Sequence, residues 1–338
     1  DGLVSGLDVD ALAAQGLRVL AAARGRFDGV ASRPARGAPL RERLDALRAV
    51  CASAHADQRI VDWEASVLAV EVSQLLLTSE GGRTEQRWHV TMPHVQATAH
   101  VAGITQTRSS AGQYNGFCQQ GGLEVLERAG FAHEGARVAA EALELAMAPP
   151  FPGGSMDVLL MPDQMMLQIH ESIGHPLELD RILGDERNYA GWSFVKPHDF
   201  GTLQYGSELM NVSFDPTRAG EFASYDFDDG GHRASKELLI ENGVLKRGLG
   251  SLESQARSGL PGVANFRSAS WNRAPIDRMA NINLEPGQAT LDELVAWSAE
   301  HTKRLPPDAT VVGPGHHDRP GHGRDHVVRH RGHHQRPL

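Results

Sequence analysis

The chain has 338 residues, a formal net charge of −9, and 41% hydrophobic and 22% charged residues, so we expect a globular protein with room for two or three domains. The acidic balance argues against a general nucleic-acid binder, and no apolar run approaches the ~20 residues that span a membrane. Its two cysteines, Cys51 and Cys118, argue against a disulfide framework and fit a reducing, cytoplasmic compartment.

The first predicted region, residues 1–80, is rich in alanine, leucine and arginine and shows no recognisable chemistry. It begins Asp1-Gly2-Leu3, without an initiator methionine or a basic-then-apolar pattern. We therefore expect no signal peptide, and a chain that is trimmed or begins inside a longer protein. A helix is predicted over Leu40–Val50, and a longer apolar segment follows over Asp62–Leu77.

Residues 81–150 form the second predicted domain, of strands plus one helix. Alternating polarity predicts strands over Thr84–Thr107. The glycine-rich stretch Gly112–Gly122 lacks the Gly-Lys-Ser/Thr ending of a phosphate loop, and we interpret it as a structural turn. One long amphipathic helix is predicted over Leu123–Met147, and the prolines and glycines of residues 148–154 then mark the best domain boundary.

The sequence His170-Glu171-Ser172-Ile173-Gly174-His175 places two imidazoles around a carboxylate. A catalytic zinc site needs neutral imidazole ligands and a nearby carboxylate, not itself a ligand, that takes a proton from water on the metal. In the familiar H-E-x-x-H pattern the histidines are one residue closer. At ~100° per residue, five steps leave His170 and His175 ~140° apart, so they converge only if the helix widens or ends between them.

The residues around this motif favour a helix that ends. Asp157–Met161 reads as a short buried strand, and Pro162 as a helix start, followed by an apolar stripe. That stripe consists of Met165, Ile169 and Ile173. Gly174 tolerates non-helical dihedrals, and Pro176 disfavours the α region for the residue before it. We therefore predict that His175 folds back from the broken end of the helix. The alternative is a chance meeting, in a chain with 17 histidines.

Four acidic residues follow the motif in a partly helical segment: Glu178, Asp180, Asp185 and Glu186. Either one of them is a hydrogen-bond partner of a motif histidine, or they form a solvated face, which we favour. A strand is predicted over Trp192–Val195, and a β-hairpin around Asn242-Gly243. Asp226–Glu237 partly matches a calcium loop, but Gly230 occupies a ligand position, and an acidic turn is the better interpretation.

Three stretches of the chain resemble the TldD/PmbA family of metallopeptidases, on its TldD-like side. They are LLMPDQMMLQ, HESIGHPLELDRILGDERNYAG and SWNRAPIDRMANINLEPG, and the resemblance runs from about residue 70 to about residue 313. PmbA-type subunits lack the histidine motif, so the chain resembles the catalytic type. We expect a mixed α+β fold, with a partial amino-terminal domain and a small central domain. A β-rich carboxy-terminal domain, residues 151–313, then begins near the motif.

The resemblance implies zinc-dependent hydrolysis of short or unfolded peptides, in which His170 and His175 hold Zn²⁺ and Glu171 serves as general base and then as proton donor. It also implies a homodimer or a heterodimer with a PmbA-like subunit. Arg278 and Asn281 either bind a peptide backbone or carboxylate, or tie down a loop, and the sequence favours neither reading.

The chain departs from the family pattern at its carboxy-terminal end. The family's third zinc ligand is understood to be a downstream cysteine, whereas both cysteines here precede His170. Family-like sequence fades near Gly313, and residues 314–338 are rich in histidine, arginine and glycine, with too few apolar residues for a core. We expect a shifted reading frame or premature end there; a metal-binding histidine tail is the alternative.

Two histidines alone would make a weak zinc site, because catalytic sites normally have three protein ligands. Either a histidine of the tail or, less favourably, His198 replaces the missing cysteine, or the chain binds zinc poorly. The alternative function is therefore a non-catalytic subunit that binds a peptide or a partner without cleaving it.

Overall fold

The computed structural model describes residues 23–29, 39–79, 81–110, 117–150, 158–188 and 190–301. The amino-terminal elements are β1 (Arg24–Asp28), α2 (Leu40–Ala54), β2 (Ile60–Leu77), β3 (Arg83–Val101), β4 (Ile104–Ser109), β5 (Gln119–Gln120), α3 (Glu124–Arg128) and α4 (Phe131–Met147). The helices of the remainder are α5 (Pro162–Ile169), η3 (His170–Gly174), α6 (His175–Leu177), α7 (Leu179–Leu183), η4 (Pro197–Asp199), α8 (Leu252–Ser258) and α9 (Leu291–His301). Its strands are β6 (Val212–Phe214), β7 (Glu237–Glu241), β8 (Val244–Leu245), β9 (Phe266–Arg267), β10 (Ile276–Asp277) and β11 (Ile282–Leu284). None of the helices described is long and apolar enough to cross a membrane.

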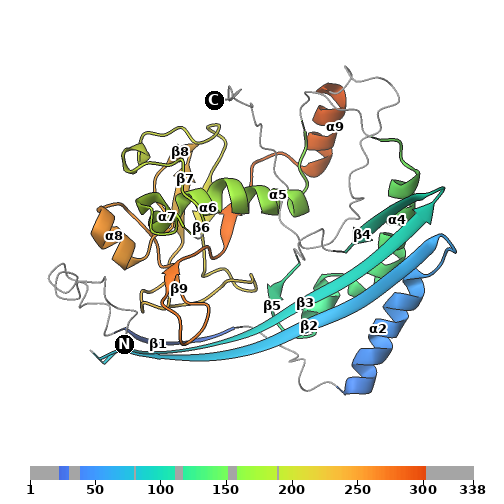
Figure 1. The fold of residues 1–338 in the computed structure, drawn as a ribbon, viewed down its shortest axis with the longest axis horizontal. Coiled ribbons are helices and arrows are strands. Elements are labelled where there is room, and N and C mark those ends of the chain that lie inside the picture. The colour runs from blue at the N-terminus through green and yellow to red at the C-terminus, as the bar shows by residue number, and fades with distance from the viewer. Residues whose placement is uncertain are drawn as a thin grey trace.

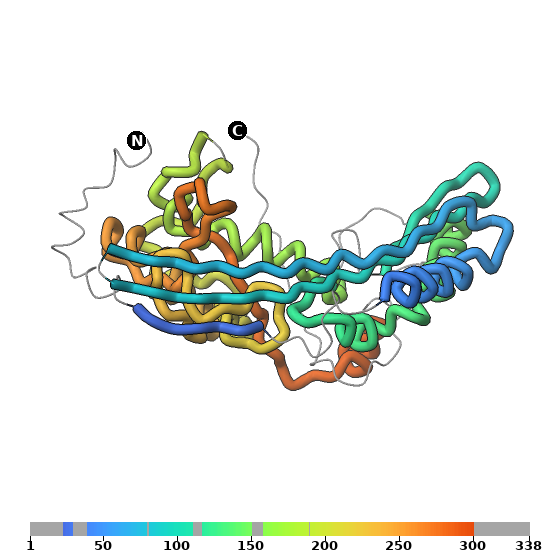
Figure 2. The backbone as a smooth tube through the Cα atoms, turned by 90° about the horizontal axis from the view of Figure 1, so that it is seen from below, coloured from blue at the N-terminus to red at the C-terminus, as the bar shows by residue number. Residues whose placement is uncertain are grey.

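A long antiparallel hairpin, β2–β3, runs the length of the molecule (Figures 1 and 2). Its strands have 18 and 19 residues, about 60 Å at the usual rise per residue. β3 is central, because β1 pairs with it in parallel and β4 and β5 pair with it antiparallel. The expected strands over Thr84–Thr107 are confirmed. The predicted boundary between residues 80 and 81 lies in the hairpin turn, and the domain division stays a prediction.

Helices α2 and α4 cover one end of this hairpin (Figure 1). Small apolar residues of β3 and α4 pack there, namely Ala97, Ala99, Val138, Ala139 and Ala142. The predicted helix over Leu40–Val50 is confirmed and extends to Ala54. The single helix predicted over Leu123–Met147 is wrong, because Gly130 adopts a left-handed φ of 64° that separates α3 from α4. Phe131, directly after it, is buried beside Val50 and Val95.

The other end of the hairpin holds a four-stranded antiparallel sheet in the order β11-β6-β7-β8 with short helices around it, whereas α9 lies apart from this sheet, on the side of α4 (Figures 1 and 2). The expected mixed α+β fold is thus confirmed. Ile173 and Leu177 pack into the core that this sheet forms with Phe214 and Leu239. The predicted hairpin at Asn242-Gly243 is also confirmed, with φ of 50° and 78°, as a tight primed turn requires.

Two strands predicted near the motif are wrong. Asp157 lies outside the described residues, and residues 158–161 form no strand but an extended entry to α5. Trp192–Val195 forms no strand either, because a side-chain hydroxyl accepts a backbone N–H group that a neighbouring strand would otherwise bind. The Val195 N–H donates to Ser193 Oγ at 3.0 Å, and that hydroxyl donates to the Pro176 carbonyl at 2.6 Å.

Side-chain amides and an indole join the hairpin to the carboxy-terminal part. Gln86 Nε2 donates to the Phe227 carbonyl at 2.7 Å, and Trp88 Nε1 donates to the Ser224 carbonyl at 2.9 Å. The turn after Phe227 is closed by Asp228, whose carboxylate accepts the backbone N–H groups of Gly230, His232 and Phe266. Its oxygens therefore bind backbone, in agreement with the acidic-turn interpretation.

Candidate metal centre

The motif lies on one continuous helical run, α5–η3–α6, that widens instead of ending. His175 has helical dihedrals, φ −59° and ψ −42°, and its N–H donates to the carbonyl of His170, five residues earlier. A bond over five residues defines a π turn, which adds one residue to the helical circuit. The prediction that His175 folds back from a broken helix is therefore wrong, and the other solution, a helix that widens, is the one that the structure adopts.

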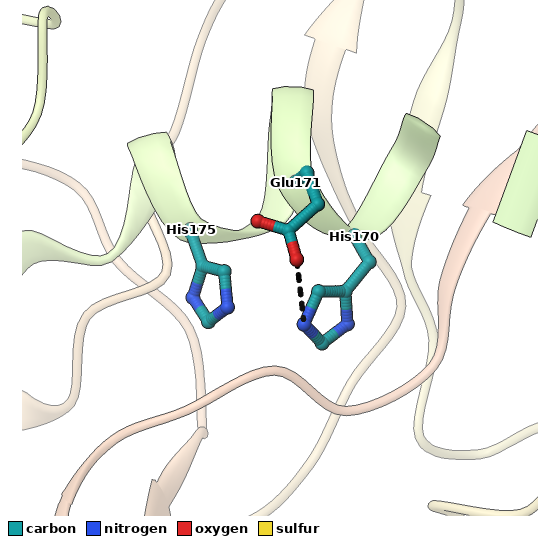
Figure 3. Close-up of side chains that lie close together, drawn as sticks. All are labelled: His170, Glu171 and His175. Carbon is teal, nitrogen blue, oxygen red and sulfur yellow. Dashed lines mark ion pairs between the residues drawn. The ribbon is translucent and has the colours of Figure 1, made fainter. Parts of the chain in front are cut away.

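The π turn brings the two histidines together although they are five residues apart. Their ring centroids lie 4.6 Å from each other with the planes at 88°. His170, Glu171 and His175 each offer one ligand atom, and these atoms lie within 4.8 Å of one another. Figure 3 shows the three side chains on the same side of the helix. The motif therefore forms a compact group of two imidazoles and one carboxylate.

A proline and a tyrosine explain why the run widens at this point. In a regular α-helix the N–H of residue 176 would donate to the carbonyl of Ser172. Pro176 has no N–H, so this carbonyl loses its backbone donor. The hydroxyl of Tyr205 donates to that carbonyl at 2.6 Å. Burial raises the pKa of Tyr205 well above its ordinary value, so the phenol keeps its proton. Tyr205 therefore supplies the hydrogen bond that Pro176 cannot make.

Gly174 allows the turn through its size and not through its backbone freedom. Its dihedrals are helical, φ −57° and ψ −67°. A Cβ atom at this position would lie 2.0 Å from Met279 Sδ and 3.0 Å from Met279 Cγ. The glycine therefore lets Met279 pack directly against the π turn.

The environment favours the neutral form of His170. Partial burial lowers its pKa first, and the neighbouring His175 lowers it further, against the opposing effect of Glu171. Glu171 Oε1 lies 3.9 Å from His170 Nε2, and its side chain is 59% exposed. A neutral imidazole is the form that binds zinc, and an exposed carboxylate beside it has room to exchange protons with water.

The acidic residues after the motif are largely buried, so the expected solvated face is wrong. Glu178 is fully buried, and its Oε2 lies 3.0 Å from Nδ1 of His175. Asp180 is buried against Asp277: each backbone N–H donates to the other's carboxylate. Asp185 pairs near the surface with Arg257. The alternative reading, one acid as a partner of a motif histidine, is the correct one for Glu178.

A hollow of ≈ 510 Å³ opens beside the motif, lined by Glu171, His175, Pro176, Arg181, Ala190, Trp192 and Arg278. Of the two candidate substrate-binding residues, the structure therefore places Arg278 at the hollow. Asn281 instead is buried, donates to the Asp215 carbonyl and to Ser224 Oγ, and accepts the N–H of Ala223. These contacts favour the loop-binding reading for Asn281. Trp192, which is 62% exposed, was not predicted as a site residue.

Within the described ranges, this is the one group of three or more potential metal-ligating side chains. Cys51, Cys118 and His198 do not belong to it, and the His198 side chain is 83% exposed. The histidine-rich tail lies outside the described residues. Two imidazoles fit zinc in chemical identity, and the described residues supply no third histidine or cysteine.

Comparison with known proteins shows that the chain is similar to curated metalloproteases. Residues 153–300 match the family model described as the PmbA/TldA metallopeptidase C-terminal domain. A metalloprotease of Methanothermobacter thermautotrophicus is 33% identical over 265 residues, covering 78% of this chain and 55% of that protein. A metalloprotease of Methanocaldococcus jannaschii is 30% identical over 244 residues, covering 72% and 51%. The chain thus spans about half the length of these curated relatives.

Solved structures show the same fold at low sequence identity. A Thermotoga maritima protein, described as a candidate modulator of DNA gyrase, superposes with a TM-score of 0.63 at 20% identity, covering 80% of this chain and 59% of that one. TldE from Thermococcus kodakarensis gives a TM-score of 0.53 at 14% identity, with the same coverage. With the matched domain and the metalloprotease relatives, these likenesses confirm the resemblance, and the chain belongs to the TldD/PmbA family.

Proposed function

We propose that the chain is a zinc-dependent peptidase that hydrolyses short or unfolded peptides. The observation that carries this proposal is the π turn, which converges His170, Glu171 and His175 on one side of a helix. The metalloprotease names of the relatives support the reaction class, and a zinc metalloprotease TldD homologue of Saccharolobus solfataricus, 30% identical over 142 residues, supports the choice of metal. That match covers 42% of this chain and 30% of that protein.

Each motif residue has a chemical role in this proposal. His170 and His175 hold the zinc ion, which when bound polarises the scissile carbonyl and makes a water at the site more acidic. Glu171 accepts the proton of the attacking water and passes it to the leaving nitrogen. The exposure of Glu171 leaves its carboxylate open to water.

The hollow beside the motif is the proposed substrate site. Arg278 lines it together with Glu171, and its guanidinium carries N–H donors suited to a peptide carbonyl or carboxylate. Trp192, on the same hollow, offers an exposed aromatic face for an apolar side chain. Membership of the TldD/PmbA family leads us to propose a dimer, either of two copies or with a PmbA-like subunit. The cysteine usage supports a cytoplasmic location.

Substitution of the proposed base tests this function. Glu171→Gln should lower peptide turnover by about 10²–10⁴-fold, because it removes the proton acceptor, while the zinc content stays unchanged. Glu42→Gln is the control, since Glu42 lies exposed on α2, at the opposite end of the hairpin from the motif (Figure 1), and should leave turnover intact. Turnover by Glu171→Gln equal to that of the wild type would refute the assigned role. Zinc binding without peptide turnover by the wild type would support the non-catalytic subunit instead.

A further inference from the structure

Glu178 occupies an unusual position for an acidic side chain. It follows α6 directly, and its side chain is fully buried. Its two neighbours in sequence, Leu177 and Leu179, are also fully buried, and the Leu179 N–H donates to the Leu249 carbonyl at 2.9 Å. The backbone on both sides is therefore anchored in the core, and the carboxylate has a fixed position beside the motif.

Arginine side chains compensate the charge of this carboxylate. Arg181, itself buried, places Nε at 3.0 Å and Nη2 at 2.9 Å from Glu178 Oε2. Arg278 Nη1 lies 3.9 Å from the other oxygen, Oε1. A buried carboxylate is costly unless it is paired, and these guanidiniums supply that pairing for Glu178.

Two groups with opposite hydrogen-bonding requirements, one acceptor and one donor, lie beside Nδ1 of His175. Glu178 Oε2 lies 3.0 Å from this nitrogen and, as a carboxylate oxygen, can only accept a hydrogen bond from it. Arg181 Nη2 lies 3.1 Å from the same nitrogen and can only donate to it. In a neutral imidazole, the first contact requires hydrogen on Nδ1 and leaves the Nε2 lone pair free. The second requires hydrogen on Nε2 and blocks metal binding there.

We propose that Glu178 is a positioning residue that selects the metal-binding tautomer of His175 against the competing donor Arg181. This inference rests on the proposed function in that it assigns His175 as a zinc ligand. The buried carboxylate holds the proton on Nδ1 and orients the ring, so Nε2 faces the metal position with its lone pair. Carboxylate partners of this kind raise metal affinity in histidine sites.

The tautomer can be read in the metal-free full-length protein by long-range nitrogen–proton correlation NMR of ¹⁵N-histidine. The His175 signals are assigned by their loss in His175→Asn. We expect a protonated Nδ1 and an unprotonated Nε2 in the wild type. Glu178→Gln should shift this balance toward protonated Nε2, because an amide both donates and accepts. It should also weaken zinc binding about 10–100-fold in a competition titration with a chelator.

Glu186→Gln is the matched control, because Glu186 also lies beside Arg278, at 3.6 Å. The partners of His175 Nδ1, by contrast, are Glu178 and Arg181. It should change neither the tautomer nor the zinc affinity. If Glu178→Gln does not fold, Glu178→Asp replaces it: the shorter side chain withdraws the carboxylate from Nδ1, and the same losses are expected, smaller in size.

A wild-type His175 protonated on Nε2 would overturn the proposal, as would a Glu178 variant with unchanged tautomer and zinc affinity. The NMR measurement requires neither metal nor turnover. A correct tautomer in a protein without peptidase activity would therefore contradict the proposed function and leave the role of Glu178 standing.

Discussion

Two helical segments of this chain are interrupted by glycine, and they are interrupted in opposite ways. Between α3 and α4, Gly130 takes a left-handed φ of 64°, and a new helix starts at Phe131. Between α5 and α6, Gly174 keeps helical dihedrals, and the run continues through a π turn. The first interruption separates two structural helices, whereas the second aligns the residues of the candidate metal centre.

The difference lies in what surrounds each glycine. No atom outside the local backbone lies within 4 Å of a Cβ placed on Gly130, so the backbone there is free to turn. Gly174 instead lies against Met279, and Tyr205 supplies the hydrogen bond that Pro176 cannot make. A glycine near a proline therefore need not end a helix where the tertiary structure replaces the backbone hydrogen bond that the proline removes.

The largest expected difference in stability and zinc affinity is between the alanine variants of the two glycines. Gly174→Ala should weaken zinc binding by distorting the π turn, and should lower the free energy of unfolding by about 1–3 kcal/mol, because the Met279 side chain must move away from the new Cβ. Gly130→Ala should cost only about 1 kcal/mol of backbone strain and leave zinc affinity unchanged. Urea unfolding and zinc titration check both variants. Equal zinc affinity in the two would contradict the role of the π turn.

The second-largest expected effect is a pH dependence of stability, and it concerns the charged residues that follow each interrupted helix. On α4, Arg137 lies between Glu134 and Glu141 and neutralises them. On α7, burial and then Asp277 raise the pKa of Asp180 from 3.8 to about 7. As pH rises from about 4 to 7, the unfolded chain therefore ionises at Asp180 before the folded one does. Folding stability contributed by this group is greatest at low pH and is lost over that window.

Asp180→Asn removes this pH dependence. Relative to the variant, the wild type should lose about 2 kcal/mol of unfolding free energy between pH 4.5 and pH 7.5. Urea unfolding at the two pH values checks this. Parallel pH profiles of wild type and variant would show that Asp180 ionises normally in the folded protein.

The smallest effect concerns the tyrosine that supports the π turn. Tyr205→Phe leaves the Ser172 carbonyl without its donor and should cost about 1 kcal/mol, together with a loss of zinc affinity. Tyr225→Phe is a matched control, because its hydroxyl donates to the Ala264 carbonyl at 2.7 Å, away from the motif. It should cost similar stability without affecting zinc. Identical zinc affinities in the two variants would contradict the proposed support by Tyr205.

Local signals in the sequence were sufficient where a short segment determines its own structure. Asn242-Gly243 predicted its hairpin because both residues accept positive φ. The spacing of His170 and His175 reduced the geometry to two solutions, a helix that widens or one that ends. The choice between them depended on Tyr205 and Met279, which lie far beyond the motif in the sequence and cannot be recognised from the motif itself.

Long-range packing also explains the other failures. The sequence alone suggests that Glu178 is a solvated acid. In the structure it is buried, paired with Arg181 and held in the core beside Leu249. Its spacing of three residues from His175 was the available signal, since residues three apart share a helical face. Arg278 and Asn281 lie three residues apart, yet one lines the hollow and the other binds a loop. Only the tertiary structure distinguishes the two.

The most direct test of the central claim is the zinc content of the full-length chain by elemental analysis. Four proteins are compared: wild type, His170→Ala, His175→Ala and, as a control at an exposed histidine, His198→Ala. The π-turn account predicts about one zinc ion per chain in the wild type and in His198→Ala, and its loss in both motif variants. Zinc retained by His170→Ala and His175→Ala would show that the metal binds elsewhere and would contradict the assignment of the motif as the metal centre.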